Sequence, residues 1–210
     1  MKKRIVIAML NALMLPLTIY GQHAEQMLGL DSQQRQDNSK DWSQSVLAIS
    51  YNPGFITSKV FVGYNEESWI EGHGFSADFR HVFRSGFGFG LSFSHSQTNF
   101  EYGWKKTIPL RLEYLGPSFV MANPVGEHWH ARLSFGLGYA HYSDGNDSED
   151  GFGYQFMAGV EYRLGSVFAL GIDLTETVHR FSQQDYDYGN KDMKSGFSRL
   201  GLNVGLRLYM

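Results

Sequence analysis

The stretch Phe87-Gly-Phe-Gly-Leu-Ser-Phe-Ser-His95 alternates bulky apolar residues with glycine and serine. Its odd positions up to Phe93 are phenylalanine or leucine, and every even position is glycine or serine. Strict alternation predicts a β-strand with two unlike faces, because successive side chains of a strand point to opposite sides. The fold therefore depends on which environment each face contacts.

Seven further segments have extended patterns of this kind, and none shows a sustained helical period. The eight predicted strands are 45–52, 70–83, 87–100, 107–121, 128–142, 151–163, 167–181 and 196–210. All but the first have 13 to 15 residues, whereas strands of soluble sheets have about five or six. This length favours strands that cross a membrane at a tilt.

The connections between the predicted strands alternate between short and long. The short ones are 84–86, 122–127 and 164–166, and the longer polar ones are 53–69, 101–106, 143–150 and 182–195. An outer-membrane barrel has tight periplasmic turns at one end and longer extracellular loops at the other. The alternation therefore predicts an up-and-down barrel with an even number of strands and both termini at the short-turn end.

The N-terminal region has a different character from the rest of the chain. Three basic residues precede a short apolar run that is interrupted by Asn11 and Pro16, which predicts a cleaved secretory signal peptide over 1–21. Residues 22–44 are polar and glutamine-rich, so we predict a flexible periplasmic lead-in, followed by a barrel domain over 45–210. No later segment is apolar enough for a transmembrane helix, which leaves a closed barrel as the form that crosses a membrane.

Composition excludes several classes of function. The 210 residues include no cysteine, which rules out disulfides and thiol chemistry. Removing 1–21 takes three of the 18 basic residues and none of the 21 acidic ones, so the remainder carries 15 minus 21, a net charge of −6. An acidic balance of this kind disfavours nucleic-acid binding.

Two barrels share this alternation: a soluble lipocalin-like barrel with the bulky face inward, and an outer-membrane barrel with the bulky face toward lipid. None of the eight lysines lies in the predicted strands after the first, although a water-facing sheet normally carries lysine. Eight strands enclose only enough space for side chains, which suits glycine, serine and a few arginines. We therefore predict an all-β, eight-stranded antiparallel up-and-down transmembrane β-barrel, with Leu110, Leu112 and Tyr114 among its lipid-facing residues.

The opposite face of the strands carries ionisable residues that we expect to form a charge network inside the lumen. They are Asp78, Arg80, Arg111, Glu113, Arg132, Glu161, Arg163, Asp173, Arg199 and Arg207. Buried ionic groups are tolerated when they satisfy one another, which favours a structural salt-bridge network. The excess of arginine leaves open a narrow path that prefers anions.

The C-terminal sequence resembles the assembly signal of outer-membrane proteins. The signal residues are Asn203, Gly205, Leu208 and Met210, with Met210 in place of the usual final aromatic residue. With the eight-strand layout, residues 45–210 resemble the small OmpX/OmpA-type barrel family, in a form common in Bacteroidetes. The resemblance implies a monomer in the cell outer membrane, surrounded by lipid and lipopolysaccharide and inserted by the barrel assembly machinery.

The sequence contains no motif that predicts a catalytic, cofactor or metal site. We therefore expect a non-enzymatic protein with a structural role or with host or envelope contacts made by its extracellular loops. The stretch His95-Ser-Gln-Thr-Asn99 loosely resembles outer-membrane lipid A deacylases, which leaves a lipid A-modifying enzyme as an alternative. A narrow channel is the other alternative.

Overall fold

The computed structural model describes residues 44–58, 60–62, 65–67, 69–102, 106–145, 147–181 and 196–210. The predicted signal peptide lies outside the described residues, as does the predicted lead-in except for Gln44. The long connections lie partly or wholly outside them as well. Among the described residues, no helix has the length and apolar character needed to cross a membrane.

The described residues form β-strands joined by turns. The strands are β1 (Gln44–Tyr51), β2 (Gly54–Ile56), β3 (Val60–Val62), β4 (Asn65–Glu67), β5 (Ile70–Val82), β6 (Phe87–Tyr102), β7 (Lys106–Pro124), β8 (Trp129–Ser143), β9 (Ser148–Arg163), β10 (Phe168–Phe181) and β11 (Gly196–Tyr209). All neighbouring pairs are antiparallel, and β3 and β4 form a separate two-stranded hairpin. The long strands agree closely with the predicted ranges.

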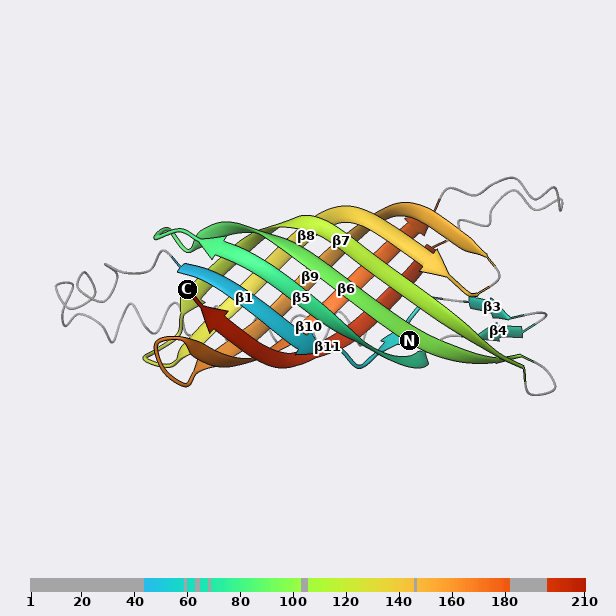
Figure 1. Ribbon diagram of the computed structural model, residues 1–210, viewed down its shortest axis with the longest axis horizontal. Helices are drawn as coiled ribbons and strands as arrows, with labels where there is room; N and C mark the ends of the chain where they lie inside the picture. The colour runs from blue at the N-terminus through green and yellow to red at the C-terminus, as the bar shows by residue number, and fades with distance from the viewer. Residues whose placement is uncertain are drawn as a thin grey trace, which may run out of the picture. The chain divides into compact units, whose positions relative to one another are not determined.

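The sheet closes on itself (Figure 1) because β1 and β2 together act as the first strand of the barrel. Both pair with β5 on one side and with β11 on the other, in one continuous register across Asn52 and Pro53. At the short-turn end, the Met210 amide donates to the Ser45 carbonyl at 2.9 Å, so the two ends of the barrel domain meet. The predicted eight-stranded antiparallel barrel is confirmed.

The stagger of the strands follows directly from the pairing register. Stepping from partner to partner around the wall gives the path Val46, Arg80, Gly90, Ser118, Gly136, Gln155, Thr177, Arg199, Ile56. The path returns to the starting strand ten residues further along, since 56 minus 46 is ten. With a rise of about 3.3 Å and a strand spacing of about 4.8 Å, eight strands with this shear tilt by about 41°.

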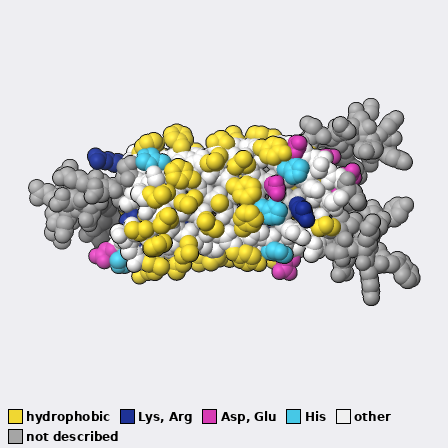
Figure 2. Space-filling view, in the orientation of Figure 1, with side chains coloured by type: hydrophobic (Ala, Val, Ile, Leu, Met, Phe, Trp, Pro, Cys, Tyr) yellow, Lys and Arg dark blue, Asp and Glu magenta, His cyan; other side chains and the backbone are white. Residues whose placement is uncertain are grey.

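Exposed apolar side chains form a band on the outside of the barrel, which Figure 2 shows on the face in view. In the opening stretch, Phe87, Phe89 and Leu91 are 45 to 63% exposed, as expected for side chains that contact lipid. On β8 the band runs from Trp129 to Tyr139, ten residue steps, which corresponds to about 25 Å along the barrel axis at this tilt. That height matches the hydrocarbon region of an outer membrane.

The loop-end half of β7 corrects the predicted assignment of its faces. Leu110, Leu112 and Tyr114 are buried in the lumen rather than directed at lipid, whereas Leu115 and Phe119 are exposed on the outside. Odd residues of β7 thus face outward from Pro109 to Asn123. The reason is that β7 continues beyond the apolar band, where the outer wall is polar and the interior is apolar.

Candidate functional site

Six charged side chains form a closed ring across the lumen. They come from five strands and consist of Arg80, Arg132, Arg207, Asp78, Glu161 and Asp173. Each arginine contacts at least two carboxylates, and each carboxylate contacts at least two arginines. Three positive and three negative charges balance, so the ring is electrically neutral.

Arg80 on β5 is the first arginine of this ring. Its Nη1 donates to Asp78 Oδ2 at 3.0 Å, and its Nη2 donates to Glu161 Oε1 at 2.5 Å. Glu161 on β9 also accepts a hydrogen bond of 2.6 Å from the Tyr209 hydroxyl. Arg80 and Glu161 are only 2% exposed, so these contacts join distant strands away from solvent.

Arg132 and Arg207 complete the ring on the other side. Arg132 donates to Asp78 Oδ2 and to Asp173 Oδ2, both at 2.9 Å. Arg207 donates to the same Asp173 oxygen at 2.6 Å and lies 3.4 Å from Glu161 Oε1. A buried charge group of this kind is tolerated because each charge is paired, whereas loss of one member leaves a buried charge without compensation.

Glycines on the wall make room for this ring. A Cβ at Gly171 would lie 2.7 Å from the Arg207 guanidinium, and a Cβ at Gly159 would collide with Asp173. Gly159 is the register partner of Asp173. Gly171 lies two residues from Ala169, the register partner of Arg207. Local sequence therefore positions the site by placing glycine directly or diagonally across from large ionic side chains. The alternation of glycine and arginine on the inner face has a direct packing cause.

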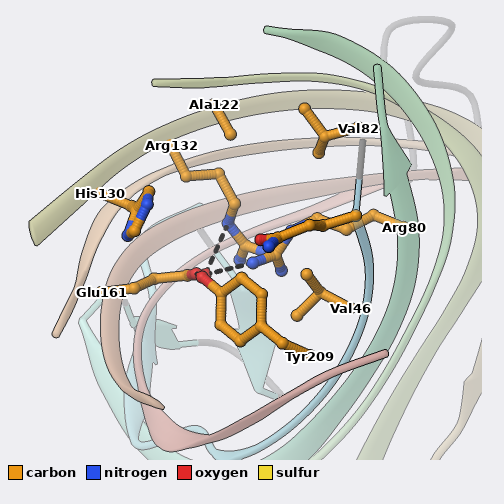
Figure 3. Close-up of a pocket in the computed structure, with 9 residues that line it drawn as sticks. Val46, Arg80, Val82, Ala122, His130, Arg132, Glu161 and Tyr209 are labelled. Carbon is orange, nitrogen blue, oxygen red and sulfur yellow. Dashed lines mark hydrogen bonds and ion pairs between the residues drawn. The ribbon is translucent and has the colours of Figure 1, made fainter. Parts of the chain in front are cut away.

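The short-turn side of the ring contains a small cavity (Figure 3). It has a volume of about 20 Å³ and is lined in part by Arg80, His130, Glu161 and Tyr209. This is room for about one water molecule. The Arg163 guanidinium lies 4.1 Å above the centre of the Tyr209 ring and donates to Gln44, which closes the lumen at this mouth.

A second polar layer lies on the loop side of the ring. Arg199 donates to the Asn52 side-chain oxygen and, at 2.7 Å, to the Asn52 carbonyl. Asn52 donates in turn to Asn203, whose amide donates to the Thr175 hydroxyl at 2.7 Å. This layer consists of one cation and neutral partners.

Tyr114 and an apolar cluster close the loop end. Tyr114 is fully buried, and Cβ atoms at Gly116 and Gly136 would lie 2.7 and 2.6 Å from its hydroxyl. Further out, Ile56, Leu110 and Leu112 pack together, with the aromatic rings of Tyr142 and Phe197 against them. The lumen is therefore filled by an ionic ring, a polar layer around Arg199, a tyrosine and an apolar plug in succession.

The structure brings together six of the ten residues predicted for the lumen network, which are those of the ring. Arg163 lies at the short-turn mouth, and Arg199 belongs to the separate polar layer. The expectation for Arg111 and Glu113 is wrong, because Arg111 is exposed on the outer wall and Glu113 pairs there with His95. Both lie beyond the apolar band, where the outside of the barrel is polar.

Sequence reasoning missed Asn52, Tyr114 and Tyr209 as lumen residues. The position of Tyr209 could have been predicted, because it lies two residues after Arg207 on the same strand and therefore on the same, lumen-facing side. Asn52 lies beside Pro53 between two strands, and Tyr114 lies in a run whose apolar positions face inward. For these two, local alternation gave no signal of a lumen position.

The stretch from His95 does not assemble a serine–histidine pair. His95 lies on the outer wall with Nδ1 2.9 Å from Glu113 Oε1, whereas the Ser96 hydroxyl is buried in the lumen and donates to the Leu112 carbonyl at 3.4 Å. A nucleophile and its base must lie within hydrogen-bond reach of each other. Among the described residues, no group of three or more histidines and acidic residues is arranged to hold a metal ion.

A closed eight-stranded barrel with an apolar exterior and a lumen filled with side chains defines an outer-membrane β-barrel protein. The chain belongs to the outer membrane protein β-barrel domain family, whose model matches residues 27–207. Its location is the outer membrane. A search of curated protein sequences found none that matches this chain.

Solved structures of small outer-membrane barrels are similar in fold. Neisserial surface protein A has a TM-score of 0.52 and 12% identity, covering 79% of this chain and 96% of that chain. The outer membrane protein OprG from Pseudomonas aeruginosa has a TM-score of 0.52 and 9% identity, covering 80% and 96%. For Ail, the attachment invasion locus protein of Yersinia pestis, the values are 0.47 and 16%, with coverage of 79% and 98%.

Proposed function

We propose that this protein is a non-enzymatic, monomeric outer-membrane barrel that acts as a rigid support for extracellular contacts with host or envelope molecules. The observation that carries the proposal is the neutral ring of six charges, stacked with Tyr114 and the apolar plug. A lumen filled in this way gives mechanical rigidity and closes the path of a narrow channel. Its function then resides on the outside and at the loop end.

The outer wall at the loop end carries a row of four polar side chains on neighbouring strands. They are His95 on β6, Glu113 on β7, His141 on β8 and Asp150 on β9. Each of these residues lies directly opposite the next one in the antiparallel pairing of its strand with the neighbouring strand. His141 Nδ1 lies 2.7 Å from Asp150 Oδ1, and Tyr139 donates to the same oxygen. The row follows the edge of the apolar band, where lipid headgroups lie, so it supports contact with lipopolysaccharide at this level.

The last strand supports insertion by the barrel assembly machinery. Leu208 pairs with Phe168 on the wall, and Met210 forms backbone hydrogen bonds with Ser45. Asn203 and Gly205 are directed to the lumen side of the same strand. We propose that the barrel assembly machinery recognises this strand, which also pairs with β1 when the barrel closes.

Conductance of the purified protein in planar lipid bilayers tests the closed lumen. We expect no conducting steps from the wild-type barrel, and ion-conducting events after Arg132→Ser combined with Tyr114→Ala, which removes material from two layers of the lumen. Steady conductance by the wild-type protein would contradict a purely supporting role.

Mass spectrometry of lipid A tests the non-enzymatic assignment. We expect the same lipid A spectrum from cells with and without the protein, and a modified lipid A species that depends on the protein would reject the assignment.

Exchange of a loop tests the extracellular contact. In this loop the structure describes Asp144, Gly145 and Asp147, and the Asp147 amide donates a hydrogen bond of 2.8 Å to Asp144 Oδ1. We expect replacement of 144–147 by Gly-Ser residues to reduce binding of whole cells to host-cell matrix or to neighbouring cells. The same replacement at the short turn 164–166 is the matched control and should leave binding unchanged, whereas equal binding by both variants and the wild type contradicts the proposal.

A further inference from the structure

Arg199 is a buried cation without a carboxylate partner. It is 5% exposed, similar to the ring arginines, yet it forms no ion pair with any acidic residue that the structure describes. Its two terminal nitrogens donate to the side-chain and backbone oxygens of Asn52, both neutral acceptors. Its Nε has no hydrogen-bond partner among the described residues.

The lumen-facing groups that the structure describes next to Arg199 supply no negative charge. Across the pairing register, Arg199 lies between Thr177 on β10 and Ile56 on β2. His179, one position further along the inner face of β10, is 2% exposed, and its ring nitrogens form no hydrogen bond of normal geometry with a described residue, although backbone groups of Phe197 and Glu113 lie near the ring. Asn203, on the inner face of β11, is already bonded to Asn52 and Thr175.

The wall around Arg199 is shaped for a guanidinium. A Cβ at Gly201 would lie 2.8 Å from its Nη1, and a Cβ at Gly54 would lie 3.1 Å from its Nη2. The chain thus keeps space for a large cation at this level, and no acidic residue that the structure describes lies beside it. A buried charge without compensation costs several kcal/mol, so a counter-charge is expected from outside the protein.

The ring cannot supply that counter-charge, because its three acids are already balanced by its three arginines. We propose that Arg199 and His179 bind a small monoanion of about the size of chloride inside the lumen. The Nε–H of Arg199 and a ring N–H of His179 are buried donors that make no hydrogen bond of normal geometry with a described residue, so both can donate to the anion. The anion would neutralise the layer between the ionic ring and the apolar plug.

Chloride dependence of stability tests this site. The purified barrel in detergent is heated in sodium chloride or in sodium gluconate at equal ionic strength, and unfolding is followed by tryptophan fluorescence. At a chloride concentration ten times its dissociation constant, we expect the midpoint to be about 4 °C higher than in gluconate. Equal wild-type midpoints in the two salts overturn the proposal and indicate that water alone solvates Arg199.

Two variants separate the site from general salt effects. Arg199→Gln should abolish the difference between chloride and gluconate, whereas Arg180→Gln, which removes an exposed cation on the same strand as His179, should retain it. A chloride effect that persists in Arg199→Gln overturns the proposal. Should Arg199→Gln fail to fold, wild-type crystals grown in bromide decide the matter: an anomalous peak beside Arg199 Nε supports the site, and its absence rejects it.

Discussion

Arg207 on β11 and Asp173 on β10 form an ion pair of 2.6 Å, and neither side chain has exposed surface. Asp173 also receives Arg132 from β8, so one carboxylate links three strands across the lumen. Because Asp173 is fully buried and pairs with two arginines, we expect its loss to destabilise the barrel more than the loss of any other ring residue.

Asp173→Asn should destabilise the barrel by about 3 kcal/mol, because two buried arginines lose a shared counter-charge. Urea unfolding followed by the heat-modifiable shift in gel migration measures the change. Glu176→Gln is the matched control: Glu176 is exposed on the same strand, with a 3.4 Å hydrogen bond from Ser198, and should change stability little. Equal effects of the two variants would show that the ring does not stabilise the fold.

Tyr114→Ala should cost about 4 kcal/mol, because it removes a fully buried aromatic side chain from the lumen. Tyr114→Phe should be neutral or slightly stabilising, since the tyrosine hydroxyl has no hydrogen-bond partner among the described residues. The same unfolding assay measures both variants. A large loss in Tyr114→Phe would indicate that the hydroxyl is bonded, for instance to a water molecule in the lumen.

Gly171→Ala should destabilise the barrel by about 2 kcal/mol, because the added Cβ would lie 2.7 Å from three atoms of the Arg207 guanidinium. Gly165→Ala in a short turn is the control, as a Cβ there would meet nothing within 4 Å. The fraction of folded protein in the outer membrane and the urea midpoint measure the difference. Identical behaviour of the two variants would contradict the close packing of Gly171 on Arg207.

Phe135→Arg should cost about 3 kcal/mol, because Phe135 lies midway along the apolar band on β8 and an arginine there enters the centre of the bilayer. Tyr139→Arg at the edge of the band should have a much smaller effect. Refolding into lipid vesicles at increasing urea concentrations gives the two values. A similar cost at both positions would show that the band is displaced along the barrel axis.

The sequence predicted the wall of the barrel more completely than its interior. Alternation from Phe87 to Phe93 follows from the geometry of a single strand, so it needed no tertiary information. The contacts inside the lumen depend on a stagger of ten residues around eight strands. This stagger sets Arg132 against Asp78, 54 positions earlier, and Arg207 against Asp173, and no local pattern contains it.

By itself, the sequence determined the strand count and the lipid-facing side of the membrane-crossing strands other than β7. Those features follow from the two-residue alternation of side chains along a strand and from the need for apolar side chains where a strand contacts lipid. The predicted alternation of short and long connections was wrong for two of the four long ones, because β6 to β9 extend into them and leave only 103–105 and 144–147 between the strands. Tertiary structure alone decided which charges pair and where β7 leaves the lipid. At that level Leu112 turns to an apolar interior and Arg111 to a polar exterior, because the environment of each face changes along the barrel axis while the parity of the strand does not.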